Sequence, residues 1–219
     1  MATDEQARKI IESHYQKNDP IGWFEELYSV ANGDVGLIPW ANEKPNPHLL
    51  AWLDRENIHG GGNSAMVVGC GLGDDAEELV RRGFTVSAFD IAQSAIDWCH
   101  QRFPSSTVKF GQADLLNLPA SWVGAFDFVF EAYTIQALPR SLRTQAIASV
   151  ASLVAPGGDL LVVCRGREDG EDEGSLPWPL THGELATFEE HHLKPATFEN
   201  YFEERDPPVR RFRALFRKG

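Results

Sequence analysis

Residues 65–90 have the sequence AMVVGCGLGDDAEELVRRGFTVSAFD, and this order of residue types predicts one β-α-β unit. Ala65–Val68 is a short apolar run typical of a buried strand, and Gly83 ends the stretch of helical spacing that follows it. Phe84–Phe89 then predicts a second strand that stops at Asp90. A tight turn beside a carboxylate at the next strand end is the arrangement that binds a nucleoside-containing cofactor.

The turn after the first strand carries three glycines at alternate positions, Gly69, Gly71 and Gly73. The dinucleotide fingerprint needs a different spacing, G-x-G-x-x-G, and here Asp74 takes the place of its last glycine. Asp74 and Asp75 open the next helix, where two carboxylates would repel a pyrophosphate and suit a ligand with a positive centre. S-adenosylmethionine is such a ligand, since it carries a sulfonium and an ammonium group. A purely structural role as helix cap and first-turn acid stays open for both residues.

From these residues onward the chain resembles the class I S-adenosylmethionine-dependent methyltransferases. GCGLG at 69–73 is similar to their glycine motif, and Asp90 stands 21 residues after Gly69, where the family has its ribose-binding acid. GQADLLNLP at 111–119 and AFDFVFEAYTIQALP at 125–139 resemble the motifs of the third and fourth strands. LVAPGGDLLVV at 153–163 resembles the turn and fifth strand. The N-terminal region loosely resembles the tryptophan-bearing cover of small-molecule, thiopurine-methyltransferase-like members.

The resemblance implies a cofactor site at the carboxyl ends of the strands. Asp90 would accept the ribose hydroxyls, Asp114 would meet the adenine amino group, and Leu115 would cover the ring. Trp40 joins them because an aromatic ring near a sulfonium gains cation–π attraction, although core packing is the alternative. The other residues expected to contact S-adenosylmethionine, or its product S-adenosylhomocysteine, are Gly69, Cys70, Gly71, Gly73, Asp75, Ile91, Ala113 and Glu131.

Methyl transfer from a sulfonium is an in-line displacement, so the protein chiefly has to align the acceptor and exclude water. Tyr133 and Gln136 follow the fourth strand, where the family places substrate contacts, and we expect them to orient the acceptor. Metal-dependent methyltransferases of the catechol type use an aspartate and a later Asp-Asn pair, whereas this chain has Glu131 alone. We expect no metal, and His191-His192 does not change this because adjacent helical residues point in different directions.

The chain has 219 residues, of which 42% are hydrophobic and 24% charged, as expected of one globular domain. Its formal net charge of −12 argues against nucleic-acid binding, because phosphate backbones attract basic surfaces. No apolar run approaches the roughly 18 residues of a membrane span, and the start MATDEQARKII is unlike a secretory signal. The three cysteines lack metal-ligand spacing. We expect a cytoplasmic enzyme with reduced thiols, a small-molecule acceptor and no obligate protein partner.

Strands that alternate with helices predict an α/β fold with a single Rossmann-like doubly wound sheet, mostly parallel and with an antiparallel terminal strand. Residues 1–60 would form an N-terminal helical cover on a methyltransferase core at 61–219, the two making one domain. The expected strands are 65–68, 84–89, 107–112, 126–131, 159–164, 195–204 and 209–217. The expected helices outside the β-α-β unit are 5–16, 23–31, 47–56, 94–102, 141–154 and 182–191.

Two regions carry charge that the motifs do not explain. The segment 165–180, RGREDGEDEGSLPWPL, is a second candidate cover whose carboxylates are either solvated or favour a cationic or amine acceptor. The terminal strand carries four arginines and is the one feature that favours an RNA substrate, but its alternation suggests a solvated strand face. These arginines are Arg210, Arg211, Arg213 and Arg217.

Two other functions stay open. An NAD(P)-dependent oxidoreductase has a related fold, but the glycine spacing, Asp74-Asp75 and the roughly 60 residues before the first strand count against it. A non-catalytic S-adenosylmethionine-binding protein would keep the same motif edge. The glycine turn, Asp90 and Asp114 are intact, which speaks against lost binding but does not bear on catalysis.

Overall fold

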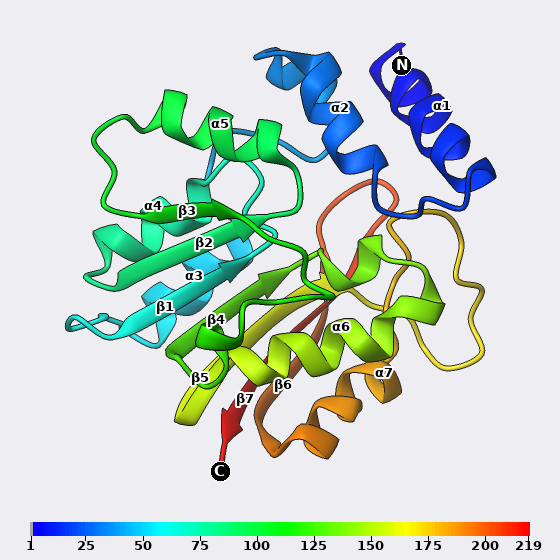
Figure 1. The fold of residues 1–219 in the computed structure, drawn as a ribbon. Helices are drawn as coiled ribbons and strands as arrows, with labels where there is room; N and C mark the ends of the chain where they lie inside the picture. Colours follow the sequence, from blue (N-terminus) through cyan, green and yellow to red (C-terminus); the bar gives the residue numbers. More distant parts are fainter. Residues whose placement is uncertain (1) are drawn as a thin grey trace.

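The computed structural model describes residues 2–219, and the side chains of residues 5–219. A seven-stranded sheet with the order β3-β2-β1-β4-β5-β7-β6 organises the chain (Figure 1). Strands β1 to β5 pair in parallel, whereas β7 runs antiparallel between β5 and β6. The Rossmann-like sheet with an antiparallel terminal strand is therefore confirmed. The strands are β1 (Ser64–Val68), β2 (Thr85–Asp90), β3 (Lys109–Gln112), β4 (Phe126–Ala132), β5 (Val154–Arg165), β6 (Leu193–Glu203) and β7 (Val209–Lys218).

The helices lie close to their expected bounds with one exception, and one strand begins earlier than expected. The expected helix 182–191 is α-helical only over its first five residues and continues as a 3-10 helix. Strand β5 begins before the Pro156-Gly157-Gly158 turn, because Val154 already pairs with Phe126 and a register shift follows. The helices are α1 (Ala2–Gln16), α2 (Trp23–Ala31), α3 (Pro47–Arg55), α4 (Asp74–Arg81), α5 (Gln93–Arg102), α6 (Arg140–Leu153) and α7 (His182–Ala186), with 3-10 helices η1 (Val35–Leu37), η2 (Ala120–Trp122), η3 (Ile135–Ala137) and η4 (Thr187–His191).

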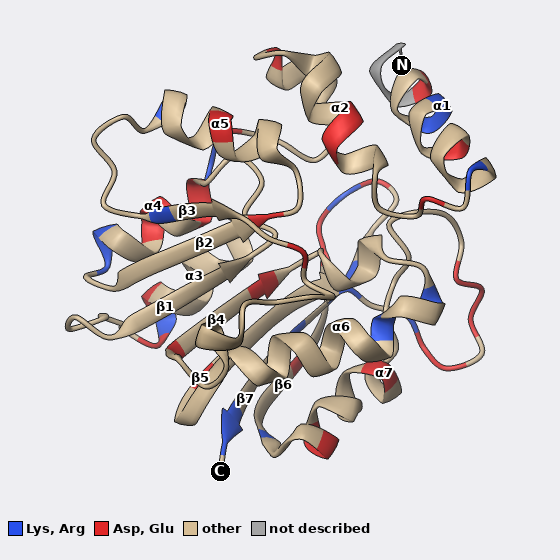
Figure 2. Cartoon of the chain, in the orientation of Figure 1, with Lys and Arg blue, Asp and Glu red and all other residues tan. Residues whose placement is uncertain are grey.

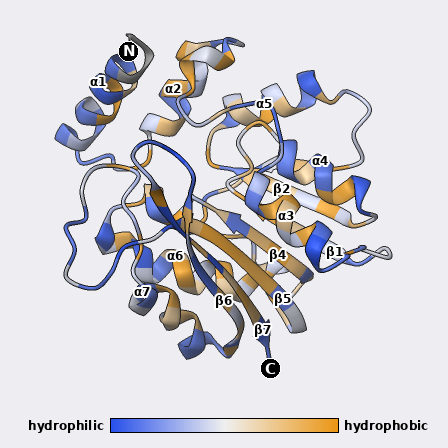
Figure 3. Cartoon of the chain, turned by 180° about the vertical axis from the view of Figure 1, so that it is seen from behind, coloured by the Kyte–Doolittle hydropathy of each residue, from blue (hydrophilic) through white to orange (hydrophobic). Residues whose placement is uncertain are grey.

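Each face of the sheet buries its own hydrophobic cluster, because successive strand residues point to opposite faces. In β5, Leu160 and Val162 pack in the cluster that contains α6, while Leu161 and Val163 pack in the cluster that contains α3 and α4. The central strands β4 and β5 are accordingly mostly hydrophobic, whereas β6 is mostly hydrophilic and the helices are mixed (Figure 3). Two covered faces identify the sheet as the doubly wound type, which binds ligands outside its carboxyl ends.

A third cluster holds the N-terminal helices against the edge of this core. Trp23 and Tyr28 from α2 pack with Trp98 from α5 and with Leu72 from the glycine turn. Helices α1 and α2 lie at the end of the sheet opposite the C-terminus (Figure 1). Because β7 is antiparallel to β5, that end is the carboxyl end of the parallel strands, where the motif residues gather. Among residues 2–219, no helix combines the length and the apolar composition needed to cross a membrane.

The basic terminal strand is not the solvated face that we expected. Arg211 and Arg213 are only 8% and 6% exposed. Arg211 donates to the Glu203 carboxylate at 2.9 and 2.6 Å, and Arg213 donates to Glu199 at 2.9 and 2.6 Å. A guanidinium group tolerates burial when carboxylates take its donors, and both glutamates stand on the neighbouring strand β6. At the other end of β7, Arg217 is exposed and pairs with Asp159.

Helix α3 is attached to the core by an aromatic stack, and this contact can be tested. Trp52 is buried and lies parallel to Phe128 of β4, with ring centroids 5.7 Å apart. We expect Trp52→Ala to lower the free energy of unfolding by about 3–5 kcal/mol in a single urea transition followed by circular dichroism. The control Val123→Ala, at a 62% exposed site, should change it by less than about 0.5 kcal/mol. Equal effects of the two changes would show that α3 is not part of the cooperative core.

Candidate active site

The glycine turn between β1 and α4 is fixed by both backbone conformation and crowding. Gly69, Gly71 and Gly73 have φ values of 60°, 52° and 88°, in the left-handed region that favours glycine. A Cβ at Gly69 would collide with the Thr134 hydroxyl, and one at Gly71 would lie 3.1 Å from the Tyr28 hydroxyl oxygen. The turn therefore presents bare backbone to the space between the strand ends and α2.

Asp90 ends β2 and closes on this turn. It is 6% exposed, and its carboxylate accepts hydrogen bonds from Gly71 N–H at 2.9 Å and Ala92 N–H at 3.0 Å. Burial raises the pKa of Asp90. A carboxylate has about four lone-pair sites, so two N–H donors leave room for two hydroxyl groups of a ligand. Cys70 belongs to the same junction, because its N–H donates to the carbonyl of Phe89 at 2.8 Å.

The residues predicted for the adenine side come together beside Asp90. Ala113 N–H donates to the Asp90 carbonyl at 3.0 Å, which joins the ends of β2 and β3. Asp114 is half-buried, and its Oδ1 accepts from Leu116 N–H at 2.8 Å. Leu115 is buried, and Ile91 is half-buried with its carbonyl accepting from the Gln112 side chain. The structure thus brings these predicted residues to one corner of the sheet.

Asp74 and Asp75 differ from the two open carboxylates that we expected. Asp74 forms a bidentate ion pair with Arg102, at 2.7 and 2.9 Å. Asp75 is engaged by the N–H of Asn46 at 2.6 Å, and burial raises its pKa to about 7. The argument that both charges repel a pyrophosphate is therefore corrected, since one is neutralised and the other anchors the start of α3. A contact of Asp75 with the cofactor stays a prediction.

Glu131, at the carboxyl end of β4, is a buried acid with one free oxygen. Its Oε1 accepts from Thr134 N–H at 2.8 Å and Ile135 N–H at 3.0 Å, while Oε2 has no partner among residues 5–219. Burial raises its pKa from the ordinary 4.5 to about 7. Between pH 4.5 and 7 the folded protein therefore holds a proton on Glu131 that the unfolded chain has lost. The contribution of this group to the free energy of unfolding falls as the pH rises through this range. A buried oxygen without a partner suits a ligand that brings a donor or a positive charge.

Tyr133 and Gln136 have different environments. Tyr133 has φ 65°, a strained conformation for a residue with a side chain, and such residues concentrate at functional sites. Burial raises its pKa to about 12, and its ring lies 5.3 Å from the Arg211 guanidinium. Gln136 is 1% exposed, and its Oε1 accepts from Arg165 N–H at 2.6 Å. We expected Gln136 to orient the acceptor directly; its amide instead positions the end of β5, which the sequence alone did not indicate.

The N-terminal cover reaches the glycine turn through Tyr28 rather than Trp40. Trp40 is 46% exposed and donates from Nε1 to the Tyr28 hydroxyl at 3.1 Å. Tyr28 is buried beside Gly71, and burial together with Asp90 raises its pKa well above its usual range. Tyr28 therefore lies between Trp40 and the glycine turn, and a contact of Trp40 with a sulfonium stays a prediction.

The loop between β5 and α7 carries several acidic residues, drawn in red in Figure 2. Three of its glutamates pair with arginines. Glu173 pairs with Arg167 at 3.1 Å and with Arg140 at 3.2 Å. Glu168 pairs with Arg210. These contacts do not support the expectation that its carboxylates favour an amine acceptor. Among residues 5–219, no group of three or more His, Cys, Asp or Glu side chains is placed to hold a metal ion.

Comparisons with known proteins agree with this geometry. Residues 65–158 match the family model described as a methyltransferase domain. The chain is 29% identical over 117 residues to a ubiquinone biosynthesis O-methyltransferase of Azotobacter vinelandii, which covers 52% of this chain and 49% of that enzyme. It is 24% identical over 176 residues to thiocyanate methyltransferase 1 of Brassica oleracea, covering 78% and 74%. The chain thus spans about half the length of the first relative.

The fold is shared with solved structures of low sequence identity. One is the 1,6-didemethyltoxoflavin-N1-methyltransferase of Burkholderia thailandensis, solved with its substrate and S-adenosylhomocysteine bound. The TM-score is 0.68 at 17% identity, covering 88% of this chain and 87% of that one. The matched family region contains the glycine turn, Asp90, Asp114 and Glu131. Together the comparisons support a class I S-adenosylmethionine-dependent methyltransferase domain in this chain.

Proposed function

We propose that this chain transfers a methyl group from S-adenosylmethionine to a small-molecule acceptor. The observation that carries the proposal is the Asp90 carboxylate, which two backbone N–H groups hold beside the glycine turn with lone pairs to spare. The match of residues 65–158 to the methyltransferase-domain model supports methyl transfer as the reaction. The acceptor's size is inferred from the covers over the strand ends, α1 and α2 on one side and the segment before α7 on the other.

The described residues fit S-adenosylmethionine. A Cβ at Gly71 would crowd the Tyr28 hydroxyl at 3.1 Å, so only bare backbone fits where the turn meets Asp90. Asp90 would hold the ribose, and Asp114 with Leu115 the adenine. The free Oε2 of Glu131 is an acceptor for a cationic ligand end. When bound, the cofactor supplies a methyl group on a sulfonium, which is an activated leaving group.

The protein's own contribution is alignment and exclusion of water. Tyr133 remains a neutral phenol at physiological pH, because its pKa is about 12. It can donate a hydrogen bond to an acceptor but does not serve there as a base. Gln136 acts one step away, since its amide fixes the backbone of Arg165. An acceptor that reacts without losing a proton beforehand suits this set of side chains.

The role of Asp90 in cofactor binding can be tested directly. Calorimetric titration with S-adenosylhomocysteine should give micromolar binding that Asp90→Ala weakens at least about 100-fold, because two charge-assisted hydrogen bonds are lost. The matched control is Asp97→Ala, an exposed acid on α5, which should bind like the unmodified protein. NAD and NADP titrated in parallel should give no heat. Binding of a nicotinamide cofactor instead would favour the oxidoreductase alternative and contradict the proposal.

The raised pKa of Glu131 allows its role in cofactor binding to be tested by the pH dependence of affinity. Binding of S-adenosylmethionine should tighten as pH rises from 5.5 to 7, because ionised Glu131 attracts a positive charge and its pKa is about 7. Glu131→Gln should flatten this slope, leaving a remainder from Asp75, whose pKa is also about 7. The control Asp127→Asn changes an acid of the same strand whose pKa is lowered by Ser64, so it should keep the full slope. An unchanged slope in Glu131→Gln would remove Glu131 from the cofactor site.

A further inference from the structure

Two arginines face each other at the carboxyl end of β5. Arg165 is the last residue of β5, and it pairs directly with Arg211 in the antiparallel ladder with β7. Arg211 in turn pairs with Tyr201 of β6. Directly paired residues project from the same face of a sheet, so the two guanidinium groups share one face. Tyr133 belongs to this face as well, since its ring lies 5.3 Å from the Arg211 guanidinium.

The two guanidinium groups are not equally compensated. Arg211 donates twice to the Glu203 carboxylate. The Arg165 side chain is half-buried and forms no hydrogen bond or ion pair with any side chain of residues 5–219. Burial, Arg211 and Arg205 all lower the pKa of Arg165. One carboxylate therefore serves this end of the ladder, and Arg165 has no counter-ion of its own.

At the opposite end of the β5–β7 ladder, the arginine has a carboxylate as its direct partner. There Arg217 pairs with Asp159 across the strands, at 2.8 and 2.9 Å. Opposite charges in directly paired positions stabilise an antiparallel pair, and like charges destabilise it. The chain has 32 acidic and 20 basic residues, so carboxylates are not scarce. Two paired arginines that share the single carboxylate of Glu203 are therefore a cost that a bound anion would remove.

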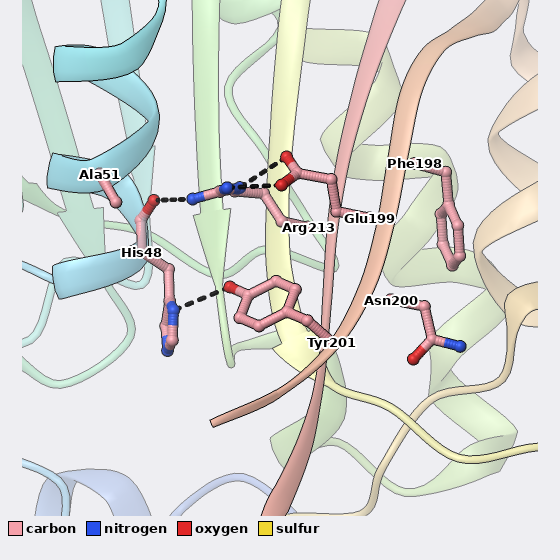
Figure 4. Close-up of a pocket in the computed structure, with 7 residues that line it drawn as sticks. All are labelled: His48, Ala51, Phe198, Glu199, Asn200, Tyr201 and Arg213. Carbon is pink, nitrogen blue, oxygen red and sulfur yellow. Dashed lines mark hydrogen bonds and ion pairs between the residues drawn. The ribbon is translucent and has the colours of Figure 1, made fainter. Parts of the chain in front are cut away.

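The surrounding groups are neutral or already paired. In the adjoining groove, the Tyr201 hydroxyl lies 2.8 Å from Nδ1 of His48, and Arg213 donates to Glu199 and to the His48 carbonyl (Figure 4). Burial, Arg211 and Arg213 lower the pKa of His48, so it stays uncharged at neutral pH. Among the side chains of residues 5–219, Arg165 and Arg205 form no hydrogen bond or ion pair. Arg211 uses its Nε and Nη2 on Glu203, which leaves its Nη1 free as well.

We infer that Arg165 and Arg211 bind a carboxylate of the methyl acceptor, which restricts the acceptor to small organic acids. A guanidinium group offers parallel N–H donors whose spacing matches the two oxygens of a carboxylate. The carboxylate is a handle that stays unmodified, and it holds the acceptor against Tyr133. That the bound carboxylate belongs to the methyl acceptor rests on the proposed function. The anion site itself does not depend on methyl transfer.

The test uses benzoate as the anion and benzamide as its uncharged analogue, each with the full chain at constant ionic strength. Benzoate should raise the melting temperature of the unmodified protein, and benzamide should not. Arg165→Gln should abolish the benzoate effect, whereas Arg217→Gln, the matched change at the other end of the ladder, should retain it. Without benzoate, Arg165→Gln should melt at the same temperature or about 2 °C higher, because a repulsion is removed.

Each outcome decides the inference. A benzoate effect that survives in Arg165→Gln, or no benzoate effect on the unmodified protein, overturns the carboxylate site. A large fall in melting temperature of Arg165→Gln alone shows that Arg165 supports folding instead, which also overturns it. S-adenosylhomocysteine affinity, measured on the same variants, should be unchanged. If that ligand fails to bind the unmodified protein while benzoate still acts through Arg165, the proposed function fails and the anion site stands.

Discussion

The bond between the Asp90 carboxylate and the N–H of Gly71 is the contact on which the site depends. It ties the end of β2 to the glycine turn, so the turn cannot move without uncovering a buried acid. The cost of leaving such a group without donors is high, since an unsatisfied buried carboxylate loses its full hydration. Glu131 repeats the device on β4, where the N–H groups of Thr134 and Ile135 hold one of its oxygens. Rigid backbone donors thus hold the acids of the strand ends before any ligand arrives.

Sequence reasoning succeeded where the determining contacts are local. The strand, glycine turn and helix of residues 65–90 follow from apolar periodicity and from glycines whose φ is positive in the structure. It failed where a partner comes from far along the chain. Asp75 meets Asn46, 29 residues away, and Arg213 meets the His48 carbonyl, 165 residues away. No spacing rule predicts such pairs, so residues that looked like open charges in the sequence are engaged by protein groups in the structure.

Net charge was a poor guide to local charge for a related reason. The net charge of −12 is a sum over the whole chain. It argues against an extended basic face, but it does not describe the charge at one corner of the sheet. The terminal strand brings Arg211 and Arg213 inward, where Glu203 and Glu199 of the neighbouring strand receive them. Alternation in β7 was recognised from the sequence, but which face would be covered depended on α3, and helix docking has no signature in strand periodicity.

The sheet divides the work between its two halves at the point where the strand order reverses. The ends of β1, β2 and β3 carry most of the predicted cofactor residues, and β4 adds Glu131. Tyr133 follows β4, and Arg165 and Arg211 lie on β5 and β7. Thr134 joins the halves, because its hydroxyl donates to the Val68 carbonyl at 3.3 Å and occupies the space beside Gly69. The glycine turn is therefore in contact with the segment that carries Tyr133. Since Gln136 in that segment accepts from the Arg165 N–H, hydrogen bonds from residues 134–136 join the two halves of the sheet directly.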